Sequence, residues 1–206
     1  MIRRTKEDAL QTRDQILDAA ERVFQRRGVS RTSLQEIAQE AGLTRGAIYW
    51  HFQDKADLFH AMMQRVTLPM TASLNAEAEL EAADPLGRLR QNVATALRQT
   101  VHDPQVQRVF EIASHKVEYV DELQAGRDRH LMERAGCMTD LERLLSLAVA
   151  AGQLRAATPV AIAAIGLHAL LDGLMHNWLL DPRAFDLEAV GAQVLEMYLG
   201  GLRSAG

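Results

Sequence analysis

Residues 32–52 have the sequence TSLQEIAQEAGLTRGAIYWHF, which is the pattern of two short helices joined by a tight turn. In the first half, the apolar residues fall on one helical face: Leu34, Ile37, Ala38 and Ala41. Gly42 can adopt a positive φ and end the first helix. Thr44 can cap the second helix with its side-chain oxygen. A helix-turn-helix is therefore predicted over residues 33–52.

The second of these helices has an unusual outer face. Ala47 and Ile48 are expected to point inward, which leaves these side chains outside: Arg45, Tyr49, Trp50 and His51. Such a face suits entry into the major groove of DNA, where an arginine can bind guanine and the other side chains can bond phosphates. The alternative is a partly buried helix in which Trp50 packs inward beside Phe52.

The composition is that of an ordinary globular protein. Of the 206 residues, 48% are hydrophobic and 24% are charged, which is enough to bury a core. The net charge is −4, but residues 1–55 carry ten Lys or Arg against eight Asp or Glu, a net of +2. The remaining residues carry 13 basic and 19 acidic side chains, a net of −6. This modest asymmetry supports a nucleic-acid contact in the first part of the chain.

The cysteine count and the apolar runs indicate a cytoplasmic protein. Cys137 is the single cysteine, so no internal disulfide can form, as is usual in a reducing compartment. The basic N-terminus is not followed by an apolar run, so no signal peptide is expected. No membrane span is expected either, since residues 160–180 are interrupted by polar side chains: His168, Asp172, His176 and Asn177.

The whole chain is predicted to be all-α. Only 5% of the residues are aromatic, and no alternating β-branched run suggests a strand. About nine helices are expected, over residues 6–27, 33–41, 45–51, 55–81, 85–102, 104–122, 125–151, 159–180 and 186–203. Capping residues mark their starts: Ser33 with Glu36, Asp54, Asp84-Pro85, Asp103-Pro104 and Thr158-Pro159. Gly28 and Gly152 mark helix ends, and Pro69 is expected to kink or end its helix.

Two domains are predicted, residues 1–54 and residues 55–206. In the first helix an apolar stripe can cover the inner faces of the helix-turn-helix: Ile16, Ala19, Ala20, Val23 and Phe24. This stripe closes a small three-helix domain. The helix that begins at Lys55 connects it to the larger helical remainder.

The residues of the first domain resemble the N-terminal domain of the TetR family of bacterial transcriptional repressors. The resemblance covers about the first sixty residues and lies in residues 12–20, Phe24, Gly28, residues 32–43, residues 46–52, Lys55 and Leu58. Residues 3–6 and 44–52 are most similar to the AcrR- and TtgR-like branch, which represses multidrug efflux pumps. Looser similarity to that branch continues in residues 84–86, 111–112, 115–116, 172–174 and 178–180.

The resemblance implies a homodimer that binds double-stranded operator DNA. Ligand binding in residues 55–206 would shift the two DNA-binding domains apart and release a palindromic operator. The positions implied to contact DNA are Thr32, Ser33, Thr44, Arg45, Gly46, Tyr49, Trp50, His51 and Lys55. Arg3, Arg4 and Lys6 form either a basic arm on the DNA backbone or a solvated tail. No cofactor and no metal ion is implied.

The last two helices are implied to form the dimer interface. Their apolar residues exceed what two terminal helices need internally: Leu167, Leu170, Leu171, Leu174, Trp178, Val190, Val194, Leu195, Met197 and Leu202. The alternative is that these residues dock onto earlier helices of the same chain.

The resemblance also implies a ligand pocket lined by Phe110, Ser114, His115, Cys137, Leu141, His168, Leu171, Asp172, Met175 and His176. Asp172 matches a pocket-facing aspartate of the efflux-repressor branch. Phe110 and Ser114 stand where that branch has polar hydrogen-bonding groups, which leaves the identity of the ligand open. The alternative for each residue is ordinary helix-bundle core. His168, Asp172 and His176, spaced by four, also allow a metal site, for which nothing supplies further ligands.

The predicted function is a repressor that is released by a small hydrophobic or aromatic inducer, such as an antibiotic or a phenolic compound. Its expected targets are the genes of a multidrug efflux pump. It would act in the bacterial cytoplasm, at the nucleoid when bound to its operator. The alternatives are a TetR-type regulator of a metabolic or catabolic operon with one specific metabolite, and an architectural DNA-binding module without an inducer. Enzyme activity is not expected, because the G-x-S-x-G, H-E-x-x-H, Walker A and dinucleotide-binding motifs are all absent.

Overall fold

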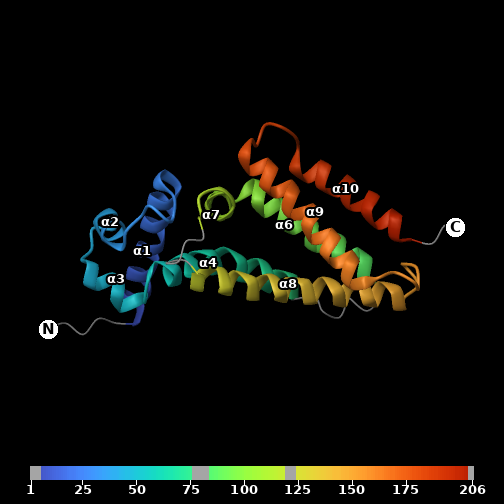
Figure 1. The fold of residues 1–206 in the computed structure, drawn as a ribbon, viewed down its shortest axis with the longest axis horizontal. Coiled ribbons are helices and arrows are strands. Elements are labelled where there is room, and N and C mark those ends of the chain that lie inside the picture. Colours follow the sequence, from blue (N-terminus) through green and yellow to red (C-terminus); the bar gives the residue numbers. More distant parts are fainter. Residues whose placement is uncertain (1–5, 76–83, 119–123, 204–206) are drawn as a thin grey trace. The chain divides into compact units, whose positions relative to one another are not determined.

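The structure, a computed structural model, describes residues 6–75, 84–118 and 124–203, with only the backbone for 70–75 and 124–134. Every regular element in the described part is a helix, so the all-α prediction is confirmed (Figure 1). The described residues form nine helices: α1 Lys6–Arg27, α2 Leu34–Glu40, α3 Arg45–His51, α4 Lys55–Asn75, α6 Pro85–His102, α7 Pro104–His115, α8 Gln124–Ala150, α9 Val160–Leu180 and α10 Leu187–Leu202.

The chain divides into two compact units. Unit 1 consists of residues 1–67 and 108–131, and unit 2 of residues 68–107 and 132–206. Three helices, α4, α7 and α8, therefore run from one unit into the other along the chain. The predicted boundary after residue 54 separates a DNA-binding part from a ligand-binding part, and it stays a prediction. The compact units divide the chain by packing alone, and unit 1 extends beyond residue 54.

The core of unit 1 is built on the predicted stripe of α1. Ile16, Ala20 and Phe24 are fully buried, as are Ile37 of α2 and Ile48 of α3. Helix α2 packs on both α1 and α3. Each large aliphatic side chain that is removed from water in this way contributes about 1.5–3 kcal/mol to folding. Burial of one face of each helix fixes which side chains of α3 remain outside.

The predicted helix ends are confirmed in unit 1. Gly28 and Gly42 have φ values of 83° and 66°, which only glycine adopts without strain, and each follows a helix. Ser33 accepts a hydrogen bond from the backbone N–H of Glu36, and the Glu36 carboxylate accepts one from the N–H of Ser33. Thr44 caps α3 by accepting from the N–H of Ala47 at 3.3 Å. The helix-turn-helix is thus fixed by local contacts.

Helix α4 continues through Pro69 to Asn75, so the proline does not end it, and the alternative of a kink stays a prediction. Two details of the helix prediction were wrong. Helix α7 ends at His115 rather than at residue 122, because the backbone leaves helical geometry after it; residues 119–123, like residues 76–83 of the predicted 55–81 helix, lie outside the described residues. Thr158 does not cap α9, since Pro159 occupies the cap position and Thr158 lies one residue too early, with its hydroxyl buried.

Ion pairs hold α1 against α2 on the surface of unit 1. Glu40 accepts hydrogen bonds from Arg22 at 2.9 Å and from Arg26 at 2.6 Å, and Glu36 pairs with Arg27. The backbone N–H of Ser33, followed by the Ser33 hydroxyl and Arg27, lowers the pKa of Glu36 below its usual value of 4.5. The hydrogen bonds from Arg26 and Arg22 lower the pKa of Glu40 likewise.

We expect replacement of Glu36 by glutamine to make the free energy of unfolding less dependent on pH in the acid range. A carboxylate whose pKa is lowered by folding stabilises the fold above its unfolded pKa and loses that contribution as the pH falls through the folded value. The wild type should therefore lose more stability than Glu36→Gln between pH 7 and pH 3, measured by urea unfolding. Glutamine can still complete the capping box, so the difference isolates the charge. Equal losses in both proteins would contradict this expectation.

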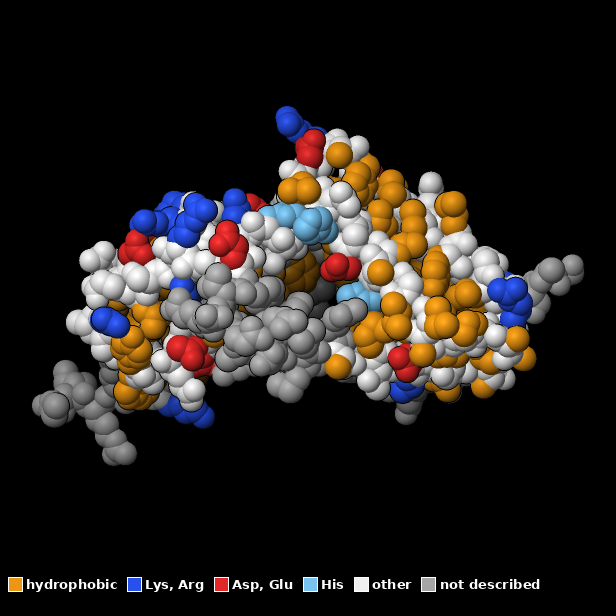
Figure 2. Space-filling view, in the orientation of Figure 1, with side chains coloured by type: hydrophobic (Ala, Val, Ile, Leu, Met, Phe, Trp, Pro, Cys, Tyr) orange, Lys and Arg blue, Asp and Glu red, His pale blue; other side chains and the backbone are white. Residues whose placement is uncertain are grey.

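In unit 2, α10 packs against α6 on one side and α9 on the other. The Tyr198 hydroxyl donates to the carbonyl of Ala163 at 2.7 Å, and a Cβ at Gly166 would overlap the same hydroxyl. This close approach joins α9 to α10. Figure 2 shows hydrophobic side chains gathered over the outer surface of these two helices, and the large exposed ones are Ile162, Ile165, Leu180 and Met197.

Helix α9 is long and apolar enough to cross a membrane by length and composition alone. A single helix of this kind is weak evidence for a span, because core and interface helices of other proteins pass the same test.

Candidate nucleic-acid interface and ligand-binding residues

The outer face of α3 is formed as the sequence predicts. Trp50 is 70% exposed and Tyr49 is 47% exposed, and Arg45 also lies at the surface. Phe52 is only 2% exposed, so the alternative in which Trp50 packs inward beside it is wrong for this chain. Two large aromatic side chains left in solvent on a seven-residue helix are costly unless another surface covers them.

Arg45 and Tyr49 act as a pair on this face. A guanidinium nitrogen of Arg45 donates to the Tyr49 hydroxyl at 2.8 Å, and the guanidinium carbon lies 5.3 Å from the ring centre. The two residues are four apart, so their side chains lie over the same side of the helix. The tyrosine therefore limits the freedom of the arginine, whose remaining N–H groups suit the paired acceptors of guanine.

The neighbouring positions leave room for DNA to approach. A Cβ at Gly46 would meet nothing closer than the Thr44 hydroxyl at 3.9 Å. His51 is half-buried, and its ring makes an edge contact with Trp50, with ring centres 4.5 Å apart. Thr44 and Gly46 are exposed. The structure thus gathers Thr44, Arg45, Gly46, Tyr49, Trp50 and His51 on one short helix and its cap.

Two of the positions implied to contact DNA have buried side chains that bind within the chain. The Lys55 side chain is buried, and its ammonium donates to the carbonyls of Ser30 at 3.1 Å and Thr32 at 2.9 Å. The Thr32 hydroxyl is also buried and donates to the carbonyl of Gly28 at 2.7 Å. Because these groups close the loop between α1 and α2, the predicted side-chain contacts of Lys55 and Thr32 with DNA are not available in this conformation. Their backbone N–H groups remain candidates for phosphate binding.

Ser33 is exposed but occupied as the cap of α2. Of the basic arm, Lys6 begins α1 and is exposed, whereas Arg3 and Arg4 lie outside the described residues.

A buried carboxylate in unit 1 has no counterpart in the sequence prediction. Glu21 of α1 is 2% exposed and pairs with Arg65 of α4 and, at 3.4 Å, with Arg108 of α7. Arg65 also pairs with Asp18 at 2.7 Å. Although burial opposes it, the hydrogen bond to Glu21 raises the pKa of Arg65, so the guanidinium stays charged. Glu21 thus joins α1 to two later helices.

Residues just after α7 are tied to the loop that follows α1. The N–H of Val29 donates to the carbonyl of Lys116 at 2.9 Å, and the Ser30 hydroxyl donates to the carbonyl of Glu118 at 2.9 Å. Gln25 of α1 donates to Glu111 of α7 at 3.2 Å. The end of α7 is therefore an integral part of unit 1.

The predicted ligand-binding residues are distributed over both units. On α7, Phe110 and His115 are partly buried and Ser114 is exposed; on α8, Leu141 is partly buried and Cys137 is exposed. On α9, His168, Leu171 and Met175 are partly buried, whereas Asp172 and His176 are exposed. The Thr100 hydroxyl of α6 lies 3.8 Å from Met175 Sδ of α9. A pocket shared by the predicted ligand-binding residues stays a prediction.

Desolvation by neighbouring atoms, followed by the charge of Asp140, raises the pKa of the Cys137 thiol above its ordinary value, even though the side chain is exposed at the surface of the single chain. In the part of the chain that the structure describes, no three His, Cys, Asp or Glu side chains converge as metal ligands would.

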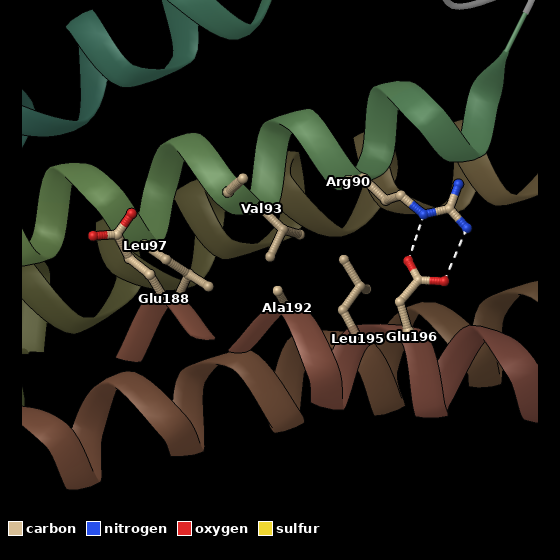
Figure 3. Close-up of a pocket in the computed structure, with 8 residues that line it drawn as sticks. Arg90, Val93, Leu97, Glu188, Ala192, Leu195 and Glu196 are labelled. Carbon is tan, nitrogen blue, oxygen red and sulfur yellow. Dashed lines mark hydrogen bonds and ion pairs between the residues drawn. The ribbon is translucent and has the colours of Figure 1, made fainter. Parts of the chain in front are cut away.

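A groove of about 250 Å³ lies between α6 and α10 (Figure 3), and it is open to the surface, since Ala94 and Ala192 of its lining are exposed. It is lined by Arg90, Val93, Ala94, Leu97, Glu188, Ala192, Leu195 and Glu196. None of these residues belongs to the predicted ligand site. Sequence reasoning missed it because nothing in the sequence tells which faces of α6 and α10 meet.

Two family models match this chain. The model described as "Bacterial regulatory proteins, tetR family" matches residues 16–62. The model described as "MAATS-type transcriptional repressor, C-terminal region" matches residues 84–203.

Curated relatives are similar over nearly the whole chain. The "HTH-type transcriptional regulator TtgR" of Pseudomonas putida is 40% identical over 187 residues, which are 91% of this chain and 89% of that protein. The "HTH-type transcriptional regulator AcrR" of Shigella flexneri is 40% identical over 211 aligned residues, covering 97% of this chain and 94% of the other.

Solved structures have the same fold. NalD, the secondary repressor of the MexAB-OprM multidrug efflux pump in Pseudomonas aeruginosa, superposes with a TM-score of 0.88 at 36% identity and covers 98% of this chain and 100% of its own. The SmeT–triclosan complex superposes with a TM-score of 0.81 at 32% identity, covering 95% of this chain and 93% of the other.

Proposed function

Since the chain belongs to the TetR family of bacterial transcriptional regulators, we propose that it represses a multidrug efflux pump and is released from DNA by small hydrophobic or aromatic compounds. The relatives named above are regulators, and NalD is a repressor of an efflux pump. A regulator of this kind acts in the cytoplasm and needs neither a cofactor nor enzyme activity.

The observation that carries the proposal is the exposed outer face of α3. Arg45, Tyr49 and Trp50 lie together in solvent, on a helix whose other face is buried through Ile48. The two α3 helices of a dimer would enter successive major grooves about 34–36 Å apart on a palindromic operator. Arg45 would contact a base, and Tyr49 and His51 would contact phosphates.

The exposed apolar face of α9 and α10 supports a homodimer. Ile162, Ile165, Leu180 and Met197 are each more than half exposed in the single chain. Packing of these two helices against the same pair in a second copy would give a four-helix interface and remove the face from water.

The inducer is proposed to bind in residues 55–206, at the pocket residues that the family resemblance implies. Triclosan, a small chlorinated phenol, is bound in the SmeT complex. Asp172, His168 and His176 recur every four residues along α9, and they would supply polar groups beside apolar neighbours such as Leu171 and Met175.

A footprint on the DNA that flanks the gene tests the whole proposal. The purified protein would be titrated alone and with triclosan, hydrophobic antibiotics and phenolic compounds. A palindromic footprint that several unrelated compounds abolish is the expected result. A footprint released by one specific metabolite alone would favour the metabolic regulator, and one that no compound disturbs would favour the architectural module. The absence of any footprint would contradict repression of a neighbouring gene.

Replacement of Asp172 by alanine is expected to impair induction and leave operator binding intact. The side chain lies on α9, away from α3 in the sequence, and it is exposed, so its loss should not disturb folding. Operator affinity would be measured by fluorescence anisotropy with and without triclosan. A variant that loses operator binding as well would assign Asp172 to the dimer interface, and a variant like the wild type in both respects would remove it from the ligand site.

A further inference from the structure

We propose that Lys55 is a positioning residue for operator recognition, because its buried ammonium joins the two ends of the segment that contains the helix-turn-helix. The family resemblance implies a direct contact with DNA at this position, whereas the contacts of the side chain point to a role inside the protein. The inference rests on the DNA binding proposed above and deepens it, since it states what holds α3 in place.

The bonds of Lys55 close the helix-turn-helix at its base. The segment starts with Ser33, the cap of α2, and ends just before Lys55, the first residue of α4. The ammonium donates to the carbonyls of Ser30 and Thr32, at 3.1 and 2.9 Å, which lie 25 and 23 residues earlier in the chain. Residues 33–54 are therefore a closed loop, and its closure restricts the conformations open to α2 and α3.

The place of closure is buried. Lys55 is 4% exposed, and the next residues of the same helix turn, Ala56 and Leu58, belong to the core. A buried ammonium needs acceptors, and the backbone carbonyls supply them. To bind a phosphate, the side chain would have to leave the core and deprive Ser30 and Thr32 of a donor, which costs the desolvation energy of those groups.

The first turn of α4 is fixed in its own right. The backbone N–H of Asp57 donates to the Asp54 carboxylate at 2.7 Å, and the N–H of Gln53 donates to the Asp57 carboxylate at 3.0 Å. Leu58 is fully buried in the same turn. The Lys55 side chain therefore extends from a firmly held piece of backbone.

The loop that receives the ammonium is fixed as well. The Thr32 hydroxyl donates to the carbonyl of Gly28 at 2.7 Å, and the N–H of Val29 donates to the carbonyl of Lys116 at 2.9 Å. Because both partners are held by other bonds, the ammonium connects two rigid segments. Its loss would let the ends of the helix-turn-helix move apart.

This closure matters for DNA because α3 lies inside the closed segment. A side chain that reads a base must be held within about 0.5 Å of its productive position. Arg45 and Tyr49 are bonded to each other on α3, so their placement on DNA depends on the placement of the helix. A protein that holds the competent conformation only part of the time binds more weakly by that fraction.

The first test compares the wild type with Lys55→Met, which keeps an apolar stem and has no N–H to donate. Without DNA, amide hydrogen exchange of residues 33–52 should be faster in the variant, and exchange in α9 and α10 should be unchanged. Affinity for the footprinted operator should fall about tenfold, as it would if about a tenth of the molecules kept α3 in place. Affinity for a scrambled duplex should fall less, because α3 makes no base contacts there.

The salt dependence of operator binding separates positioning from a phosphate contact. Loss of a lysine that binds a phosphate lowers the slope of log K against log salt by about one for each protomer. Loss of a positioning residue leaves that slope unchanged, since the complex that forms has the same contacts. A shallower slope with equal losses on operator and scrambled DNA would overturn the proposal. An unchanged ratio of the two affinities beside a lower stability to urea would overturn it too.

Two further variants complete the test. Thr32→Val removes the buried hydroxyl that holds the same loop, so it should give the same pattern to a smaller extent. It decides the question if circular dichroism shows that Lys55→Met is unfolded. Lys116→Met removes a lysine charge and keeps the backbone carbonyl that binds Val29, so exchange and affinity should stay as in the wild type.

Unchanged exchange and operator affinity in the folded variants of Lys55 and Thr32 would overturn the proposal. A wild type that binds no duplex would instead contradict DNA binding itself, and hydrogen exchange alone would then report whether Lys55 closes the segment.

Discussion

Replacement of Glu21 by alanine is expected to lower the free energy of unfolding by about 3–5 kcal/mol, the usual cost of breaking a buried ion pair from one side. Glu21 is almost completely buried and pairs with Arg65 and Arg108. The Arg65 side chain is only 18% exposed, so without Glu21 it would keep its charge in a poorly hydrated place with Asp18 as its remaining partner among the described ion pairs. Urea unfolding at pH 7 measures the difference.

Two further variants separate the buried charge from the loss of helix contacts in general. Glu21→Gln retains the size and some hydrogen bonding of the side chain but removes the charge, so we expect a smaller loss than for alanine. Glu7→Ala, at an exposed position on the same helix, should change stability by less than about 0.5 kcal/mol. A loss below about 1 kcal/mol for Glu21→Ala would mean that the pairs with Arg65 and Arg108 do not support the fold.

Replacement of Arg45 by alanine is expected to weaken specific operator binding by about 5- to 150-fold, or about 1–3 kcal/mol, if the arginine contacts a base. The residue is exposed, and its described hydrogen bond is to Tyr49, so the fold should not change. Affinity for the footprinted operator and for a scrambled duplex would be measured at one salt concentration. The loss should be confined to the operator, because a base contact discriminates between sequences.

Tyr49→Phe tests how the arginine is held. It removes the hydroxyl that accepts from Arg45 but keeps the ring over which the guanidinium lies, so we expect a smaller loss of operator affinity than for Arg45→Ala. Equal losses on operator and scrambled DNA for Arg45→Ala would reassign the arginine to a phosphate, and unchanged operator affinity would refute any contact with DNA.

The helix-turn-helix could be predicted from the sequence because its determinants are local. Ser33 and Glu36 are three residues apart, Gly42 and Thr44 mark one turn, and the apolar spacing fixes which side of α3 faces inward. The exposure of Trp50 follows from that spacing alone. The all-α class and the order of the helices could be predicted from the capping residues and from the absence of strand patterns, and the described residues confirm both. The matching family models confirm the family resemblance.

The interactions that the sequence did not reveal join residues far apart in the chain. Glu21 is 44 residues from Arg65 and 87 from Arg108, and a glutamate on the first helix has many alternative partners. Lys55 is one of the positions implied to contact DNA, but its long side chain reaches back to a loop 23–25 residues earlier. The prediction that Thr158 caps α9 was wrong for a local reason. Pro159 occupies the N-cap position instead of being the first helical residue.

The buried ammonium of Lys55 also makes this chain unusually easy to probe by chemical labelling. The sequence contains only three lysines, of which Lys6 is exposed and Lys116 is partly buried. An acylating reagent needs an accessible, unprotonated amine, and the Lys55 amine is covered and bonded to two carbonyls. Its modification rate therefore reports how often the loop between α1 and α2 opens, whereas dyes or surface linkers directed at lysine would attach chiefly at Lys6 and Lys116 and leave α3 unmodified.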